Sequence, residues 1–584
     1  MIMKKILSII CLLLVSTTLW AEPIGEQRAR EIALEFFSQH STRSIVGDIS
    51  LEWAGDVIGE NCATGSALNT SLMYIYNRGN NSGYVVVAGD TNLNPIIAYS
   101  LDTTLDTDNM AEATEAILEA WCRQVESARK AAKPISGTTM RATTRANDAM
   151  LYETALWDQV DPYNREAPII DGQRSLTGCA ATAMSILCYY HRWPEKGVGT
   201  TPGYSYQDSY GHTHSIPSNT LGRKYDYDKM LMNYGNGFTN DQGNAVAALM
   251  KDMGTSIKMM YHPEGSGAYP IGVVNALFTY FGYAKDMQLL FGAGLSTEEW
   301  NDAIRENLRN YGPVFFSGSG DRGGHAFIVD GCDAGDKFHF NFGWSGNGNG
   351  YWRIPEIEFY KNQGIITNLR PDRDGTTVYR DNLYLFAWDQ YNGIAPKEVT
   401  SYATGTSFYC LLGCFANLGA YTFDGEVKLV LCDRNGNWKE ELSTHNFTIE
   451  PDTYSYPTHD NKITITKPLE EGDRMRIYYK ARNYAEWQWA RSYDNSAVDE
   501  VLVKCSPEDM AEGFYFKYDK STKELYVGNK NAMKLNIYND ETNELIAWGE
   551  LEFNTTGKIA NMPSGRYRIE ASLGSDPYVL IVKL

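Results

Sequence analysis

Two helical patterns and a pair of strand patterns dominate the first part of the chain. Apolar residues recur at helical spacing in residues 26–40, EQRAREIALEFFSQH, and again in residues 110–133. Between them, SGYVVVAGD (82–90) and NPIIAYSL (94–101) are apolar runs rich in β-branched residues and bounded by turn residues, as strands are. These patterns predict a compact α+β unit at the N-terminal end.

The pattern then changes twice. Residues 151–371 mix helical stretches, aromatic strands and glycine loops, whereas residues 383–505 alternate strand patterns with turn signals, a rhythm typical of a β-sandwich. A shorter strand-rich stretch follows to the C-terminus. We therefore predict an α+β protein whose parts are an N-terminal segment at 1–21, the α+β unit at 22–145, a mixed domain at 146–373, an Ig-like β-sandwich at 374–505 and a small all-β domain at 506–584.

The first 21 residues have the composition of a secretory signal peptide. Lys4 and Lys5 precede an apolar run from Ile6 to Val15, and small and polar residues follow up to Ala21. That run is too short to cross a bilayer core of about 30 Å as a helix. We expect a protein that is secreted or held at the cell surface or in the periplasm. Loss of Cys11 with the signal leaves an odd number of irregularly spaced cysteines, which we expect to be mostly buried thiols rather than disulfides.

Charge and composition exclude some classes of partner. The 584 residues are 43% hydrophobic, so the chain is not a disordered protein, and the formal net charge is −20. Binding to nucleic acid requires clustered Lys and Arg that displace counterions from phosphates, and here these residues are scattered. We therefore expect no nucleic-acid partner.

The segment TGCAATAMSILCYYHRWP places a cysteine at the start of a predicted helix. Cys179 follows Gly178, and the Ala, Met, Ile and Leu positions after it favour a buried helix that ends near Trp193-Pro194. Unpaired N–H groups and the helix dipole stabilise a thiolate at a helix N-terminus. Cys179 is therefore the candidate nucleophile, and Cys188, further along the same helix, gains nothing from its position.

Three more residues complete a candidate site. His325, in DRGGHAFIVDGCD, stands at the predicted exposed end of a buried strand, where it is placed to act as a base. Asn341, in KFHFNFGWSGNGNGYW, lies on the strand face opposite to three phenylalanines, and its amide is placed to orient the imidazole. Gln173 precedes Cys179 by six positions and is placed to join the Cys179 backbone N–H in an oxyanion hole, where one donor typically contributes about 3–4 kcal/mol.

In the order Gln, Cys, His, Asn, these residues resemble the streptopain family of secreted bacterial cysteine peptidases, which have a papain-like fold. LWDQVDPYN, TGCAATAMSILCYYHRWP, GGHAFIVDG and NFGWSGNGNGYW all carry the resemblance. It implies that residues 146–373 are a peptidase domain acting on protein or peptide substrates. It further implies Cys179 as nucleophile, His325 as general base and acid, Gln173 in the oxyanion hole and Trp344 packed over the histidine.

The resemblance extends to the N-terminal unit. SGYVVVAGDTNLNPIIAYS is similar to the propeptide of this family, which blocks the active site until it is removed. The chain would then be a zymogen inhibited by its own propeptide, residues 22–145. Residues 136–150, SGTTMRATTRANDAM, are small and polar with no apolar period, which predicts an exposed linker that a protease cuts near Arg141 or Arg145.

Two other functions stay open at this point. A peptidoglycan-cleaving cysteine hydrolase uses the same order of residues, although such hydrolases are seldom made latent. A surface adhesin with a papain-like scaffold would instead use the C-terminal β domains, which are candidates for binding a surface or a partner protein. That class predicts a broken site, and no catalytic position is substituted here.

We expect no cofactor and no required metal. GHTHS supplies His212 and His214 in a polar loop without a third clear partner, and CLLGC, with Cys410 and Cys414, lacks a second cysteine pair. DRDG (372–375) and DRNGN (433–437) resemble fragments of a calcium loop without its downstream acidic ligand.

Overall fold

The chain divides into two compact units in the computed structural model. One consists of residues 1–290 and 296–378, and the other of residues 291–295 and 379–584. The structure describes residues 23–40, 49–55, most of 71–125 and, apart from short gaps, 149–583. The predicted signal peptide and nearly all of the predicted linker therefore lie outside the described residues. Among the described helices, none is long and apolar enough to span a membrane.

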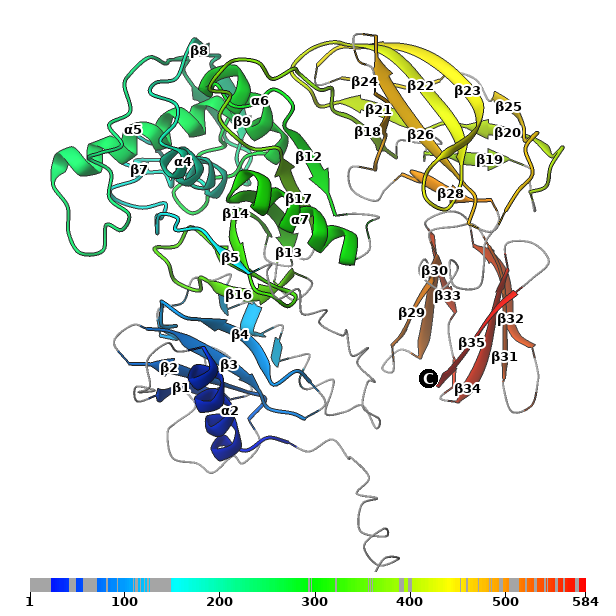
Figure 1. Cartoon of the computed structure of the whole chain (residues 1–584), viewed down its shortest axis with the longest axis horizontal. Coiled ribbons are helices and arrows are strands. Elements are labelled where there is room, and N and C mark those ends of the chain that lie inside the picture. Colours follow the sequence, from blue (N-terminus) through cyan, green and yellow to red (C-terminus); the bar gives the residue numbers. More distant parts are fainter. Residues whose placement is uncertain are drawn as a thin grey trace, which may run out of the picture. The chain divides into compact units, whose positions relative to one another are not determined.

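An eleven-stranded sheet forms the framework of the first unit (Figure 1). In sheet order its main path is β1 (Ile49–Gly55), β2 (Met73–Arg78), β3 (Tyr84–Ala88), β4 (Ile96–Ser100), β16 (Gly350–Arg353), β15 (Lys337–Asn341), β14 (Gly323–Cys332), β13 (Val314–Gly320), β17 (Lys361–Thr367) and β12 (Gln288–Phe291), and β5 (Met150–Leu151) pairs with β14. Three short ribbons stand apart: β6 (Ile169–Ile170) with β7 (Gln173–Arg174), β8 (Thr200–Thr201) with β11 (Asn219–Thr220), and β9 (Tyr204–Gln207) with β10 (Thr213–Ile216).

The helices of this unit bury the faces that their sequences predict. They are α2 (Glu26–Gln39), α4 (Cys179–His191), α5 (Asn240–Ser256), α6 (Pro270–Phe281) and α7 (Thr297–Tyr311). Helix α2 packs Ala29, Ala33 and Phe37, one helical turn apart, into a core with residues of β2 and β3. Helix α4 is apolar on all sides and is buried from Ala180 to Tyr189 against α5, α6, β13 and β14.

The N-terminal strands and the peptidase-like strands meet within this one sheet. Strand β4 pairs with β16 through Tyr99 and Tyr351, whose rings stack with centroids 4.7 Å apart. The Tyr99 hydroxyl donates a hydrogen bond of 3.3 Å to Asp333. Because backbone pairing and side-chain stacking coincide here, the α+β unit extends the sheet of the following domain.

The second unit consists of antiparallel sheets. Its strands are β18 (Leu383–Phe386), β19 (Ala395–Lys397), β20 (Ser407–Leu411), β21 (Cys414–Asn417), β22 (Phe423–Cys432), β23 (Trp438–Ile449), β24 (Thr453–Ser455), β25 (Asn461–Thr464), β26 (Arg474–Ala481), β27 (Gln488–Trp489), β28 (Glu500–Leu502), β29 (Phe514–Asp519), β30 (Glu524–Asn529), β31 (Met533–Asn539), β32 (Leu545–Leu551), β33 (Thr555–Ile559), β34 (Arg566–Ser572) and β35 (Pro577–Lys583). Inward residues of β22, such as Val427, Leu429 and Leu431, join side chains of β18, β20, β25 and β26 in one buried cluster. The predicted α+β class is confirmed, with several small antiparallel sheets at the C-terminal end.

Candidate active site

Helix α4 begins at Cys179. The preceding Gly178 has φ 86°, a conformation that favours glycine, and a Cβ there would lie 2.5 Å from the Met259 sulfur. Cys179 is partly exposed, whereas the other six cysteines of the described residues are buried. The backbone turn at Gly178 therefore places a partly exposed cysteine at a helix N-terminus, as the sequence predicts.

The surroundings of the Cys179 thiol favour its neutral form. Burial raises its pKa above the ordinary value, against the effect of backbone hydrogen bonds from Ala326, Ala180 and Cys179 itself. The N–H of Ala326 belongs to strand β14, directly after His325. The thiol consequently lies against the strand that carries the candidate base.

His325 is buried near the start of β14, and its ring is fixed by a backbone carbonyl. Its Nε2 lies 2.9 Å from the carbonyl oxygen of Phe342. A carbonyl oxygen only accepts, so Nε2 carries the proton and Nδ1 is left with the lone pair of a base. Burial lowers the pKa of His325 to about 4, although the hydrogen bond to Phe342 acts in the opposite direction. The imidazole is therefore neutral at pH 7.

Trp344 lies over the histidine ring. The two rings stack with centroids 4.5 Å apart and an interplanar angle of 20°. Trp344 also stacks on Phe342 at 5.2 Å, and Phe359 closes another side of the imidazole at 5.1 Å. The arrangement matches the packing that the family resemblance implies for Trp344 and shields the ring from water.

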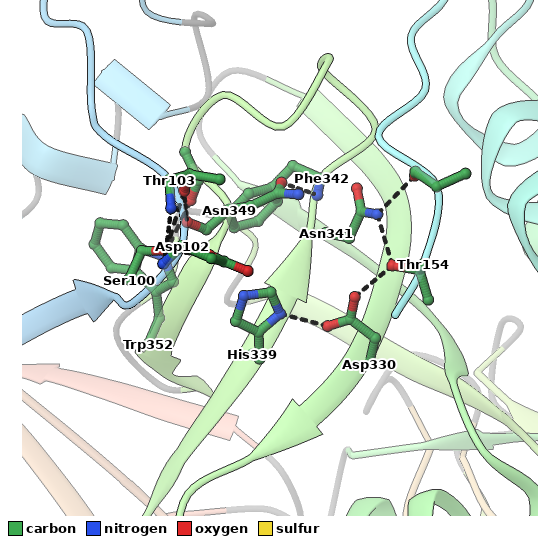
Figure 2. Close-up of polar contacts among 12 residues, drawn as sticks. Ser100, Asp102, Thr103, Thr154, Asp330, His339, Asn341, Phe342, Asn349 and Trp352 are labelled. Atoms are coloured by element: carbon green, nitrogen blue, oxygen red, sulfur yellow. Dashed lines mark hydrogen bonds and ion pairs between the residues drawn. The ribbon is translucent and has the colours of Figure 1, made fainter. Parts of the chain in front are cut away.

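Asn341 does not hold the His325 ring in the way the sequence suggests. Its amide donates hydrogen bonds of 2.9 Å to the Thr154 hydroxyl (Figure 2) and to the carbonyl of Ala155. Its side-chain oxygen accepts from the N–H of Gly343. The side chain is fully buried. All of these contacts fix the end of β15, so Asn341 acts on the histidine only through the backbone that follows it.

A buried ion pair between Asp330 and His339 is connected to Asn341 through the Thr154 hydroxyl. The Thr154 hydroxyl donates to Asp330, and the other oxygen of Asp330 lies 2.5 Å from Nδ1 of His339 (Figure 2). Burial alone would lower the pKa of His339, but the charge and hydrogen bond of Asp330, together with the charge of Asp102, raise it. His339 and Asp330 therefore tie β15 to β14 and have no contact with the candidate thiol in the described residues.

Asn349 is a site residue that sequence reasoning missed. Its side-chain oxygen accepts the N–H of Phe342 at 3.0 Å, and it is 2% exposed. Asn349 therefore holds the N–H of the same residue whose carbonyl receives His325, and the two groups belong to successive peptide units. The glycines around Asn349 in GNGNG indicated only a flexible loop, and an acceptor for a backbone N–H leaves no sequence motif.

Gln173 stands apart from these contacts. It is exposed on strand β7, paired with Ile170 across a two-residue turn at Asp171 and Gly172, both of which have positive φ. Within the described part of the chain, no hydrogen bond joins its amide to Cys179. Its place in an oxyanion hole therefore stays a prediction.

The N-terminal α+β part of the first unit, the predicted propeptide, contacts the loop that carries Asn349. The Thr103 hydroxyl donates to the Asn349 carbonyl at 3.5 Å, and the Tyr84 hydroxyl donates to the Gly348 carbonyl at 3.5 Å. A Cβ at Gly350 would collide with the Tyr84 hydroxyl and would lie 2.7 Å from the carbonyl oxygen of Tyr99. The same loop thus contacts Phe342, whose carbonyl receives His325, on one side and the N-terminal α+β unit on the other.

Comparison with known proteins identifies both parts. Residues 157–352 match the Peptidase C10 family, and residues 21–125 match the Spi protease inhibitor family. The thiol protease/hemagglutinin PrtT of Porphyromonas gingivalis is 31% identical over 599 aligned residues, which cover 98% of this chain and 67% of that protein. The chain belongs to the Peptidase C10 family. Streptopain of Streptococcus pyogenes is 29% identical over 57% of this chain and 85% of its own length.

Among solved structures, a fragment of prointerpain A from Prevotella intermedia is 25% identical and covers 51% of this chain and 95% of its own, with a TM-score of 0.41. The C10 protein described here is therefore a cysteine peptidase with an inhibitory propeptide, a zymogen of the streptopain type, as the sequence resemblance implied.

Proposed function

We propose that this C10 peptidase is a secreted endopeptidase in which Cys179 attacks the peptide carbonyl and His325 acts as base and acid. The observation that carries the proposal is the hydrogen bond from His325 Nε2 to the Phe342 carbonyl, because it leaves Nδ1 unprotonated. The N–H of Ala326, next to His325 in β14, lies against the thiol, which supports the pairing of the two residues. Trp344 keeps the ring in place from its open face.

The reaction divides into two steps. Proton transfer from Cys179 to His325 gives a thiolate, which adds to the carbonyl while Gln173 and the Cys179 backbone N–H receive the oxyanion. His325 then protonates the departing amine, and a thioester remains on Cys179. Water, deprotonated by His325, hydrolyses the thioester and releases the second product.

Latency follows from the protonation states of the precursor. A raised pKa for Cys179 and a lowered pKa for His325 both favour a neutral thiol beside a neutral imidazole, which is the unreactive form of the pair. The predicted propeptide, residues 22–145, contacts the loop behind His325. We infer that its removal, after cleavage within residues 136–150, changes the environment of the pair and permits formation of the ion pair.

The remaining parts of the chain are assigned by analogy. Residues 1–21 serve as the signal peptide, a role supported by Lys4 and Lys5 ahead of the apolar run from Ile6 to Val15. The antiparallel strands of residues 374–505 and 506–584 are proposed to form an Ig-like sandwich and a small β domain. PrtT, which aligns with 98% of the chain, carries the word hemagglutinin in its name, and this favours a binding role for the C-terminal domains.

Digestion of two substrates distinguishes a protein endopeptidase from a peptidoglycan hydrolase. Matured enzyme is incubated with denatured casein and with purified peptidoglycan, with the Cys179→Ala protein and thiol-alkylated enzyme as controls. We expect casein peptides from the untreated wild type alone. Release of wall fragments without casein peptides would favour the peptidoglycan hydrolase instead.

Substitution tests the assignment of Gln173. Gln173→Ala should lower kcat by roughly 10²-fold, because the donor acts on the oxyanion of the transition state. Its exposed position predicts an unchanged unfolding midpoint. An unchanged kcat would remove Gln173 from the site, and Asn341→Ala, which acts only through the backbone, should cost less than His325→Ala.

A further inference from the structure

Four potential metal ligands converge away from the candidate active site. They are Asp171, Asp208, His212 and His214, and one ligand atom of each lies within 4.8 Å of the others. Asp171 belongs to the turn between β6 and β7. The other three belong to the β9–β10 hairpin, Asp208 directly after β9 and the two histidines at the start of β10. The four side chains therefore bring together two hairpins that are distant in the sequence.

The separations between Asp208 and the two histidines are close to those of a tetrahedral site. One oxygen of Asp208 lies 2.8 Å from Nε2 of His214 and 3.3 Å from Nδ1 of His212. Ligand atoms of a tetrahedral zinc ion, at metal–ligand distances of about 2.0–2.1 Å, are about 3.3 Å apart. Because the four ligand atoms lie within 4.8 Å of one another rather than 3.3 Å, binding draws the outer ligands inward, and this movement falls on His212, whose side chain is 66% exposed, and on the exposed Asp171.

Asp208 is the preorganised member of this cluster. Its Oδ1 accepts the N–H groups of Tyr210 and His212 at 2.9 Å each, which leaves Oδ2 facing both imidazoles. Tyr206 packs beside His214 at 5.5 Å and donates its hydroxyl to the Tyr261 carbonyl. The ligand-bearing hairpin is thus anchored to the body of the domain.

We propose that Asp171, Asp208, His212 and His214 bind one zinc ion, or another divalent cation that prefers nitrogen and carboxylate ligands. Two imidazoles and two carboxylates suit Zn²⁺ and its first-row neighbours, whereas Ca²⁺ and Mg²⁺ prefer oxygen ligands alone. The third and fourth ligands escaped the sequence pattern of GHTHS because Asp208 precedes it by a turn and Asp171 comes from another hairpin. The peptidase mechanism does not use this ion.

The ion would clamp the segment that carries Gln173. Asp171 and Gln173 flank Gly172 in the β6–β7 hairpin, so coordination of Asp171 fixes that turn against β9–β10. This consequence rests on the proposed role of Gln173, but the metal site itself does not.

Binding is measured on the Cys179→Ala chain, in which the active-site thiol cannot capture the metal. After chelation and desalting, the protein is dialysed against Zn²⁺ and, separately, against Co²⁺, whose visible spectrum reports tetrahedral coordination. We expect one tightly bound equivalent per chain. His445→Ala in the second unit is the matched control for loss of a histidine and should bind normally.

Two conservative variants keep the test valid if a histidine variant fails to fold. Asp171→Asn preserves the residue type that tolerates φ 49°, and Asp208→Asn preserves the acceptor for the two N–H groups. Each should weaken zinc binding at least as much as loss of an outer-sphere partner, about 10–100-fold, and His214→Ala should abolish the cobalt spectrum. Unchanged affinity in all three variants, or no stoichiometric binding by the parent chain, overturns the site.

Hydrogen exchange tests the clamp separately. Zn²⁺ should slow exchange of the backbone amides in residues 169–174 of the Cys179→Ala chain and have no effect in its Asp171→Asn derivative. Stoichiometric binding without this protection would retain the three ligands of the β9–β10 hairpin and refute the participation of Asp171. Because the Cys179→Ala chain lacks the proposed nucleophile, neither the metal-binding result nor the hydrogen-exchange result depends on peptidase activity.

Discussion

Replacement of Asn349 by alanine tests whether the backbone at Phe342 positions the catalytic histidine. The substitution removes the acceptor of the Phe342 N–H, which is buried and has its hydrogen bond of 3.0 Å to this side chain. The Asn341–Phe342 peptide is then no longer held by Asn349. A compensating rotation about the Phe342 backbone bonds displaces the Phe342 carbonyl, which belongs to the following peptide and receives His325 Nε2 at 2.9 Å. Asn349 touches neither the thiol nor the ring in the described structure, so it is a positioning residue.

The expected loss of kcat follows from the charge that the His325 imidazole carries during turnover. An unsatisfied buried N–H costs about 1–3 kcal/mol of stability. A hydrogen bond to a charged group contributes about 1.5–3 kcal/mol, and His325 is an imidazolium when it holds the thiol proton. At about 1.4 kcal/mol per factor of ten, weakening of the His325–Phe342 bond lowers kcat by roughly 10- to 100-fold.

The assay is hydrolysis of a fluorogenic peptide by matured enzyme across a pH series. In Asn349→Ala, KM should change less than kcat, and the alkaline limb, where the thiolate–imidazolium pair loses its proton, should move to lower pH. The sign follows because the Phe342 hydrogen bond raises the pKa of His325, so its loss makes the imidazolium a stronger acid. Asn349→Asp keeps the acceptor and adds a negative charge, so it should recover much of kcat and move the same limb to higher pH.

A purely structural role gives a different result. If both variants lost activity only in proportion to the fraction unfolded, with pH profiles that superimpose on the wild type, the reasoning about Phe342 would be refuted. Denaturant unfolding of each variant under assay conditions supplies the folded fraction for that comparison.

Three further predictions concern the precursor. Alkylation of Cys179 in the intact chain should be slow at pH 7 and accelerate only above the ordinary thiol pKa, because burial raises the pKa of this group; fast labelling at pH 7, measured by mass spectrometry, would contradict it. Gly350→Ala should loosen the propeptide through collision with Tyr84 and raise precursor activity without changing the mature enzyme, whereas Gly265→Ala, where a Cβ meets nothing within 4 Å, should leave latency intact. Wild-type precursor in reducing buffer should lose its propeptide by cleavage within residues 136–150, and the Cys179→Ala precursor should do so only after mature wild type is added; unaided trimming of the variant, seen by gel and N-terminal sequencing, would exclude Cys179 as the nucleophile.

The sequence was sufficient where side-chain pattern decides local structure. The apolar run after Cys179 predicted the helix that the structure places at Cys179–His191, and the residues after His325 predicted a buried strand, now β14. The strands at 82–90 and 94–101 also form as an antiparallel pair, β3 with β4. Each of these elements has one dominant periodicity, which local propensity reinforces.

The side-chain pattern could not predict the contacts of the candidate site that are made by backbone groups. Alternation along β15 predicted that Asn341 shares a face with His339, but every residue of that strand is buried, so alternation could not show which partner each face meets. In the structure the His325 ring is hydrogen-bonded to the Phe342 carbonyl, and every residue type has a carbonyl. Contacts such as that of Asn349 depend on a loop that returns to its own strand, and spacing alone does not encode that path.

The pairing of β4 with β16 means that maturation changes the surface of the enzyme as well as its active site. Strand β16 has neighbours on both sides in the precursor, β15 and β4. Departure of the propeptide turns β16 into an edge strand with unpaired main-chain N–H and C=O groups. The Tyr351 ring also loses Tyr99, on which it stacks in the precursor. Exposed edge strands pair readily with other chains, and a short edge strand limits such aggregation. The four residues of β16 thus set how well the activated enzyme resists self-association, a demand that the precursor never meets.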